Sequence, residues 1–341
     1  IDFASTTTSF FKIAEYKMKH PEYQSYSLDD IISDYTSSFI SLTNKELLIK
    51  LKVATDSFST FSLIKHLFKD DYGFNRPLIA LDKDSNVDIV YIATNNPTHY
   101  SLTKKVLESK KHVICEKPIS LKEEDVERVY STAAKNNVKF MVAQVLRFWP
   151  EYELLKEIYD TKKYGKLLSG TMIRLGGYPK WSWDGWMMDE KRSGLVPYDL
   201  HIHDLDFMVY AFGAPKKVAH QFRSKLPDQD FISVTYDFGD FSINSEASWY
   251  ATSYPFTAEF RFQFEDALVS NENGKMQIFL RDGKIDLSED AEGDTGDINL
   301  PKSDAYANEI KYFLDCVIND KDVEKVKDHE LLTVLKILNS L

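Results

Sequence analysis

The feature that most constrains this chain is an alternation of strand and helix patterns between residues 87 and 146. Three short apolar runs, rich in β-branched residues, resemble strands buried on both faces. These runs are at 87–94, 112–116 and 138–144. Amphipathic segments at 100–110 and 120–134 separate them. The alternation predicts a parallel sheet with right-handed crossovers, which is a doubly wound, Rossmann-like α/β domain.

The pattern changes after residue 150. A helical segment at 151–163 is followed by runs that alternate apolar and polar residues, as in a sheet with one covered face. These strand-like runs are at 168–175, 217–223, 231–238, 241–251, 257–264 and 277–287. Helical segments at 304–318 and 323–340 close the chain. The second half is therefore predicted to be an α+β domain with a mainly antiparallel open sheet.

We accordingly expect two domains. Residues 1–148 form a dinucleotide-binding domain whose N-terminal part is atypical or truncated, and 149–341 form a domain for substrate binding and oligomerisation. The last helix is a candidate to pack back on the first domain. Before the clear pattern, 47–55 resembles a strand and 58–70 a helix, whereas 1–46 contains no clean opening strand.

Charge and cysteine content narrow the class of protein. The formal net charge of -11 argues against a nucleic-acid partner, which needs a basic surface. The two cysteines, Cys115 and Cys316, form no disulfide or metal-binding pattern, so a reducing cytoplasm is the simplest location. No apolar run reaches the roughly 18 residues that a membrane helix needs, so no membrane partner is expected.

Polar side chains follow each predicted strand of the first domain. Thr94, Asn96 and His99 follow the first, Glu116 and Lys117 the second, and Gln144 and Arg147 the third. Ligands of open parallel sheets bind beyond the carboxyl ends of the strands. Each residue alone is more often an ordinary surface or packed group, but three such ends in succession favour a site.

A second cluster of titratable residues lies at 198–206. On a helix, Asp199, His203 and Asp206 share one face while His201 points elsewhere. A carboxylate one turn from an imidazole can support its charged form, as a general base requires. A polar helix face without chemistry is the plain alternative. His-x-His with aspartates can also bind a metal, but the helical spacing that continues to Gly213 disfavours that, and no metal is expected.

Aromatic residues form the third feature. The chain carries Trp149, Tyr178, Trp183 and Trp186, with Trp181 beside them. Indole faces pack against the apolar face of a sugar ring, so these residues are candidates for substrate binding. Ordinary core or interface packing explains them equally well.

The residues Val87–His99, Lys111–Pro118 and Gly194–Asp206 together resemble the Gfo/Idh/MocA oxidoreductases. The resemblance extends from about residue 80 to the C-terminus and depends on Glu-Lys-Pro after an apolar strand, followed by Asp-x-x-x-His-x-x-Asp. It implies NAD or NADP as cofactor, with Thr94, Asn96, His99, Glu116 and Arg147 near it. It also implies that Lys117 hydrogen-bonds the reacting hydroxyl, that Lys117–Pro118 is cis, and that Asp199 and His203 complete the catalytic set.

One departure concerns the phosphate-binding loop. No glycine precedes Gly73, so the glycine-rich loop that approaches the cofactor pyrophosphate is missing from the sequence. Either that loop lies upstream of Ile1 or the N-terminal region has diverged. Asp56 resembles the acidic residue that binds the adenosine ribose and would favour NAD over NADP.

The sequence thus predicts hydride transfer between a nicotinamide and a secondary hydroxyl of a sugar, inositol or related polyol. Two alternatives remain open, namely a non-oxidative glycosidase of the same fold that retains its NAD, and a non-catalytic sugar or nucleotide sensor. The expected partner is a small molecule, and the expected assembly is a homodimer or homotetramer.

Overall fold

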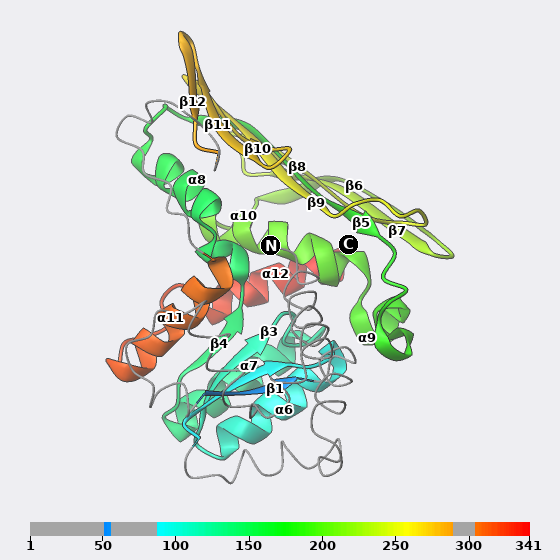
Figure 1. Ribbon diagram of the computed structural model, residues 1–341, viewed down its shortest axis with the longest axis vertical. Coiled ribbons are helices and arrows are strands. Elements are labelled where there is room, and N and C mark those ends of the chain that lie inside the picture. The colour runs from blue at the N-terminus through cyan, green and yellow to red at the C-terminus, as the bar shows by residue number, and fades with distance from the viewer. Residues whose placement is uncertain (1–50, 56–86, 289–303) are drawn as a thin grey trace, which may run out of the picture. The chain divides into compact units, whose positions relative to one another are not determined.

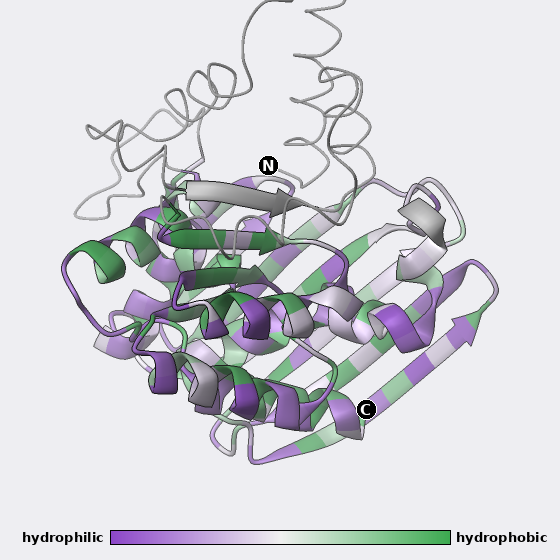
Figure 2. Cartoon of the chain, turned by 90° about the horizontal axis from the view of Figure 1, so that it is seen from below, coloured by the Kyte–Doolittle hydropathy of each residue, from purple (hydrophilic) through white to green (hydrophobic). Residues whose placement is uncertain are grey.

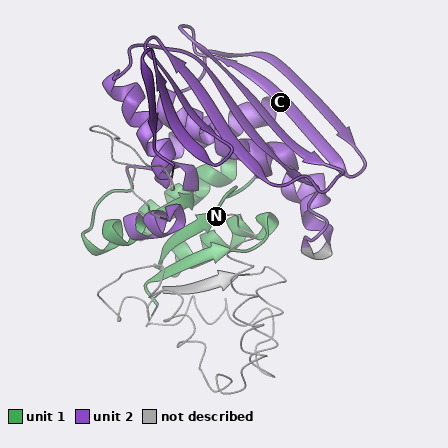
Figure 3. Cartoon of the chain, turned by 45° about the horizontal axis from the view of Figure 1, so that its top comes forward, with its two compact units in different colours: residues 1–120, 124–143, 313–323 green, residues 121–123, 144–312, 324–341 purple. Residues whose placement is uncertain are grey.

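The computed structural model describes residues 51–55, 87–288 and 304–341. The chain divides into two compact units (Figure 3). Among the described residues, unit 1 contains 51–55, 87–120, 124–143 and 313–323, and unit 2 contains the remainder. The predictions for 1–46 and 58–70 lie outside the described residues. No described helix is both long and apolar enough to cross a bilayer.

Unit 1 is built on a parallel sheet of strands in the order β1-β2-β3-β4 (Figure 1). The strands are β1 (Leu51–Thr55), β2 (Ile89–Ala93), β3 (His112–Glu116) and β4 (Phe140–Ala143). The three strands predicted between 87 and 146 are therefore confirmed, and 47–55 contains a fourth. Most apolar side chains of β2, β3 and β4 are buried, and Val90, Ile92 and Val113 are each 0% exposed. Burial on both faces explains why these strands do not alternate with polar residues.

Two helices connect these strands. Helix α6 (Asn96–Glu108) begins directly after β2, with Pro97 in its first turn, where proline's missing N–H costs no hydrogen bond. Helix α7 (Glu123–Asn136) buries Val126, Val129 and Ala133, which recur at helical spacing. Each helix returns the chain to the start of the next parallel strand, so the ends of β2 and β3 lie at the same edge of the sheet.

Unit 2 is built on an eight-stranded sheet in the order β12-β11-β10-β9-β5-β8-β7-β6. Its strands are β5 (Leu167–Gly177), β6 (Lys217–Leu226), β7 (Gln229–Asp237), β8 (Ser242–Tyr250), β9 (Thr257–Phe264), β10 (Ala267–Glu272), β11 (Lys275–Leu280) and β12 (Gly283–Asp286). Its pairs are antiparallel except β5 with β8. A mainly antiparallel sheet is thus confirmed. The prediction missed β10 and joined β11 to β12.

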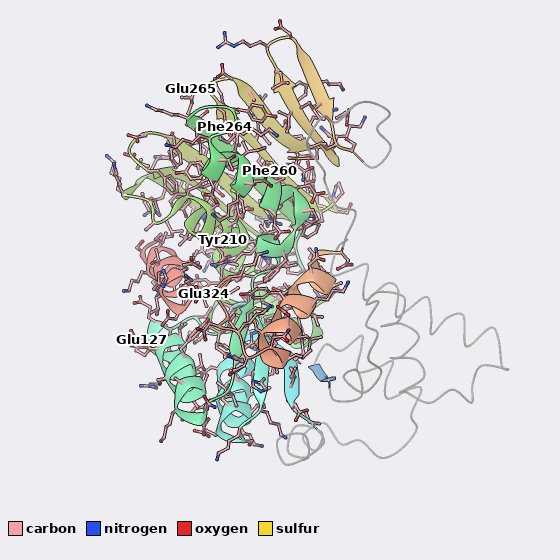
Figure 4. The ribbon with its side chains drawn as sticks, turned by 90° about the vertical axis from the view of Figure 1, so that its left-hand side faces the viewer. Glu127, Tyr210, Phe260, Phe264, Glu265 and Glu324 are labelled. Atoms are coloured by element: carbon pink, nitrogen blue, oxygen red, sulfur yellow. The ribbon has the colours of Figure 1, made fainter. Side chains whose placement is uncertain are left out.

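Helices cover one face of this sheet. They are α8 (Pro150–Thr161), whose Tyr152 meets β9, and α10 (Ile202–Phe212), whose Phe212 meets Phe262 of β9. Helix α12 (Asp328–Ser340) packs against α10, and the residues of α11 (Ala305–Ile318) are divided between the two units. Along β7 buried and partly exposed residues alternate, and hydropathy bands cross the strands accordingly (Figure 2). Tyr152 of α8 packs edge-on against Phe260 of β9, at 4.9 Å between ring centroids, and Phe260 lies on the covered face (Figure 4).

Replacing that ring tests how unit 2 is held together. Phe260→Ala removes a side chain that is 1% exposed and should lower the free energy of unfolding by about 3–5 kcal/mol. Gln263→Ala, on the exposed face of the same strand, should change it by less than about 0.5 kcal/mol. Urea unfolding followed by tryptophan fluorescence measures both, and equal losses would contradict the assignment of faces.

Candidate active site

The loop between β2 and α6 is ordered by its own side chains. The hydroxyls of Thr94 and Thr98 are 2.6 Å apart, and Thr98 Oγ1 donates to the Asn95 carbonyl. Thr94 and the buried Asn96, both predicted cofactor residues, therefore lie at the carboxyl edge of the sheet. Hydroxyl and amide groups at this edge can bind a ribose or an amide group.

Asn95 is a residue that the sequence prediction passed over. Its Oδ1 atom is buried and has no hydrogen-bond partner among the described residues. A buried acceptor without a partner is costly, and a ligand that donates a hydrogen bond would remove that cost. The edge of the sheet therefore fits a cofactor that carries hydroxyl or amide donors, as a nicotinamide dinucleotide does. The position of Asn95, one residue after Thr94 at the end of a strand, could have identified it as a candidate from the sequence.

Glu116 and Lys117 lie at the end of β3. Tyr91 of β2 donates a hydrogen bond of 2.5 Å to Glu116 Oε1. Burial raises the pKa of Glu116, while the Tyr91 hydroxyl and the Lys117 charge oppose that rise. The Lys117–Pro118 peptide bond is cis, as the resemblance implied. Lys117 is partly exposed at the end of this strand.

His99 differs from the prediction that it lines the cofactor cleft. Its ring is 1% exposed, and its two nitrogens face backbone carbonyls. Nδ1 is 2.8 Å from Pro118 O, and Nε2 is 2.8 Å from Thr94 O. Burial lowers the pKa of His99, although the two carbonyls raise it. The ring is thus occupied by the chain itself, and we do not assign it as a cofactor contact.

In unit 2, the helix predicted at 198–212 is confirmed, but it begins as a π-helix. Pro197–His201 form one π-helical turn that continues directly into α10. Gly194 precedes it with φ 77°, and a Cβ there would lie 2.3 Å from the Tyr198 ring. The Val196 N–H donates to Asp230 of β7, which fixes the entry to the turn. π-Helical turns frequently occur at functional sites, so this turn draws attention to Asp199 within it.

Asp199 and His203 are both partly exposed, four residues apart on this continuous helix. Asp206, expected on the same face, is 1% exposed and bonded elsewhere. The prediction that Asp206 lies with Asp199 and His203 on an accessible face is therefore wrong. Its carboxylate points into the interior of unit 2 and binds Arg147. Asp199 and His203, both partly exposed, remain the candidates for an acid–imidazole pair.

His201 points into unit 2, as its offset from that pair predicted. Its Nε2 is 2.6 Å from the Tyr236 hydroxyl of β7, and its Nδ1 is 3.2 Å from Ser245 Oγ of β8. Burial, with a smaller contribution from the Arg174 charge, lowers its pKa to about 3. A neutral imidazole can donate to one hydroxyl and accept from the other, so the ring joins the π-helical turn to the sheet.

Two arginines neutralise the buried aspartates of α10. Arg174 of β5 binds Asp204, with Nη2 at 2.7 Å from Oδ1 and Nε at 3.2 Å from both oxygens. Arg147 binds Asp206 through Nε at 2.8 Å and Nη2 at 2.6 Å, and its Nη1 donates to Glu330. Such paired, bidentate contacts are what buried charges require.

Arg147 therefore differs from its predicted place near the nicotinamide. Its side chain is 0% exposed, and its guanidinium lies 4.8 Å from the ring centroid of Tyr210, which is labelled in Figure 4. The guanidinium donates to Asp206, Glu330 and the Lys325 carbonyl, and it is not accessible to a cofactor. We assign it to the ion-pair network of unit 2.

The aromatic candidates do not form one cluster of contacts among the described residues. Tyr178 packs edge-on against Trp249, at 5.8 Å between centroids. Trp149, before α8, and Trp186, in a short 3₁₀ helix, are partly exposed. Exposed indoles remain candidates for sugar contacts. The Trp183 side chain and Asp56 lie outside what the structure describes.

Unit 1 has the parallel sheet of a Rossmann-type fold, which commonly binds dinucleotides, and unit 2 has an open, mainly antiparallel sheet with Asp199 and His203 on one continuous helix. Residues 51–144 match a family described as "Oxidoreductase family, NAD-binding Rossmann fold", and 152–269 match its "GFO/IDH/MocA C-terminal domain". The chain belongs to the Gfo/Idh/MocA family of NAD-binding oxidoreductases, as the sequence motifs predicted.

Individual relatives carry different activities. The chain is 32% identical over 169 residues to 2,7-anhydro-N-acetylneuraminate hydratase of Escherichia coli, covering 47% of this chain and 45% of the relative. It is 31% identical over 153 residues to myo-inositol 2-dehydrogenase of Thermotoga maritima, covering 44% and 43%. The matched region thus spans under half the length of these relatives.

Solved structures extend the likeness in fold. Levoglucosan dehydrogenase, in complex with NADH and levoglucosan, superposes with a TM-score of 0.67 at 18% identity, covering 85% of this chain and 86% of that one. At this identity the likeness establishes the fold of the chain and leaves its substrate to experiment.

The environment of His201 predicts acid sensitivity. Its folded pKa of about 3 lies below the ordinary 6.5, so the unfolded chain binds the proton more readily. Its contribution is complete above pH 6.5 and should be lost at about 1.4 kcal/mol per pH unit as the pH falls toward 3. Urea unfolding should show a shallower acid dependence for His201→Gln than for wild type. Exposed His329→Gln is the control, and parallel wild-type and His201→Gln profiles would refute the idea.

The ion-pair assignment of Arg147 is tested by Arg147→Met. Removing the cation leaves Asp206 charged and buried, so the free energy of unfolding should fall by about 3–5 kcal/mol. Arg281→Met, which breaks an exposed pair with Asp266, should cost at most about 1 kcal/mol. Loss of NADH affinity in a fully stable Arg147→Met protein would instead restore the cofactor role.

Proposed function

We propose that this chain transfers a hydride between a nicotinamide cofactor, NAD or NADP, and a secondary hydroxyl of a sugar, inositol or related polyol. The observation that carries the proposal is the placement of Lys117 directly after β3, at the carboxyl edge of a Rossmann-type sheet. Ligands of such sheets bind at that edge. The names of the inositol and levoglucosan dehydrogenases give the substrate class its support.

The cofactor side of the proposal uses the strand ends of unit 1. Thr94, Asn95 and Asn96 offer hydroxyl and amide groups for the ribose and carboxamide, and the unpartnered Asn95 Oδ1 would accept from one of them. Glu116 would contribute its carboxylate to the ribose or the backbone, with Tyr91 holding it in place. The bound nicotinamide would accept or supply the hydride at C4.

Lys117 acts on the substrate oxygen in this proposal. As the hydride leaves carbon, the hydroxyl oxygen gains negative charge, and an ammonium donor lowers the energy of that alkoxide-like state. Because the donor is already in place at the end of a rigid strand, little reorganisation accompanies the reaction.

His203 takes the hydroxyl proton, and Asp199 stabilises the imidazolium that results. A carboxylate four residues before an imidazole on one helix is suited to that role. His201 and the Asp230 contact to Val196 fix the turn from which Asp199 projects. The proposal requires that these groups and Lys117 act on the same hydroxyl.

The first alternative is a reaction without net oxidation. A relative at 32% identity is named a hydratase, and hydration changes no overall oxidation state. A retained cofactor in such an enzyme would be oxidised and reduced within one turnover. Incubation with candidate sugars separates the two, because a dehydrogenase accumulates NADH at 340 nm, whereas a hydratase or glycosidase forms product with no change in absorbance.

The partly exposed Trp149 and Trp186 are proposed to contact the apolar face of the sugar, and Tyr178 is a further candidate for such a contact. A homodimer or homotetramer in the cytoplasm stays a prediction from the sequence. Light scattering of the purified chain measures the number of subunits.

Two single substitutions test the catalytic assignment. Lys117→Ala and His203→Ala should each lower kcat by ~10²–10⁴, as expected when a proton-transferring or oxyanion-binding group is lost. The exposed Lys122→Ala and His329→Ala are matched controls that should keep kcat. Steady-state formation of NADH across a panel of polyols provides the measurement, with NADH binding by fluorescence confirming that the site remains intact. Near-normal kcat in both Lys117→Ala and His203→Ala would eliminate the mechanism.

A further inference from the structure

The ring of His99 lies between two loops at the edge of the unit 1 sheet. It projects from the first turn of α6, back to the carbonyl of Thr94 at the end of β2, and across to the carbonyl of Pro118 after β3. Both nitrogens are 2.8 Å from oxygen, and the side chain is 1% exposed. The two carbonyls and the surrounding side chains therefore fix the orientation of the ring. Both of its nitrogens point to the backbone and neither points outward to a ligand.

The two carbonyls are not equivalent. The contact to Pro118 is fully buried, whereas the contact to Thr94 is only partly buried. A buried carbonyl that loses its donor has no water to replace it, so the Pro118 carbonyl depends more strongly on His99. An imidazolium donates to both oxygens, and a neutral ring donates to one; in either case the Pro118 carbonyl is the acceptor that most needs the proton.

Pro118 immediately follows Lys117. A change in the path of the Pro118 backbone therefore moves the ammonium that we place on the reacting hydroxyl. Errors of about 1 Å in such a group can cost ~10²-fold in rate. The β3 strand holds Lys117 from one side through its ladder with β4. That ladder ends at Glu116, and His99 bonds to the carbonyl of Pro118, the residue after Lys117.

We propose that His99 is a positioning residue for Lys117, acting through a hydrogen bond from Nδ1 to the Pro118 carbonyl. The expected effect of His99 on the reaction rate rests on the proposed function. The expected effect of His99 on the order of the Lys117–Pro118 segment rests on the hydrogen-bond geometry alone. It assigns a role to a histidine whose place in the sequence suggested a direct contact with the cofactor.

Two variants of His99, to asparagine and to glutamine, separate the bond to Pro118 from the bond to Thr94. The amide nitrogen of asparagine can occupy about the position of imidazole Nδ1, and that of glutamine about the position of Nε2. His99→Asn therefore keeps a donor to Pro118 and loses the one to Thr94, whereas His99→Gln does the reverse. Both variants lose the ring, so each controls for the packing defect in the other.

The expected result is a split between the two variants in the full-length protein. His99→Gln should lower kcat by about 10-fold or more with NADH Kd nearly unchanged, and His99→Asn should keep most of kcat. Amide hydrogen exchange of the 115–121 segment, read by mass spectrometry, should be faster in His99→Gln than in His99→Asn or wild type. Thermal unfolding of both variants confirms that they are folded at the assay temperature.

Equal loss of kcat and equal exchange in the two variants would overturn the proposal, because the ring would then serve only packing. Full activity and unchanged exchange in His99→Gln would overturn it as well. A wild-type protein that oxidises no polyol would remove the proposed function but not this inference, since exchange of 115–121 still decides whether the bond orders the loop.

Discussion

Two carboxylates are buried at the start of α10, and much of unit 2 is arranged to neutralise them. Asp204 and Asp206 are at most 1% exposed, so each needs a cation and several hydrogen bonds to offset the loss of water. Arg174 reaches Asp204 from the sheet, and Arg147 reaches Asp206 from the turn before α8. Because guanidinium groups bind carboxylates in a fixed, bidentate geometry, these pairs set both the position and the rotation of the helix. The orientation of Asp199 and His203 follows from that rotation.

The repeating strands of unit 1 were predictable because burial on both faces leaves a continuous apolar run that the sequence displays directly. Strand β10 was missed for the opposite reason, since Ala267–Glu272 is short and carries polar residues at its end. A better signal was present. Asn273 and Gly274 both have positive φ, of 55° and 71°, as a two-residue hairpin turn between strands requires. Asn-Gly between two short runs would have predicted β10, the turn and β11 together.

The positions of chemically important residues were predictable, but their roles were only partly so. Lys117 follows a strand and Asp199 and His203 share a helix, as the sequence indicated, while their catalytic roles stay predictions. Spacing does not show which carboxylate faces an arginine that is distant in sequence, such as Arg147, 59 residues before Asp206. It also does not show the π-helical turn, which depends on Gly194 and on Asp230 of a later strand. Hydrogen bonds and ion pairs between residues distant in sequence determine both features, and a local sequence pattern does not reveal such partners.

Three histidines show how environment assigns chemistry to the same side chain. His99 faces two carbonyls, which can only accept, so its protons are committed to the backbone. His201 faces two hydroxyls, which can donate or accept, and burial keeps it neutral. His203 alone of the three is partly exposed on its helix, with a carboxylate one turn away. A general base must exchange its proton with a substrate and then with solvent, and a ring enclosed by the protein can do neither. Access therefore favours His203 for the proposed proton transfer, while the two buried rings are bonded to the segments that carry the proposed groups Lys117 and Asp199.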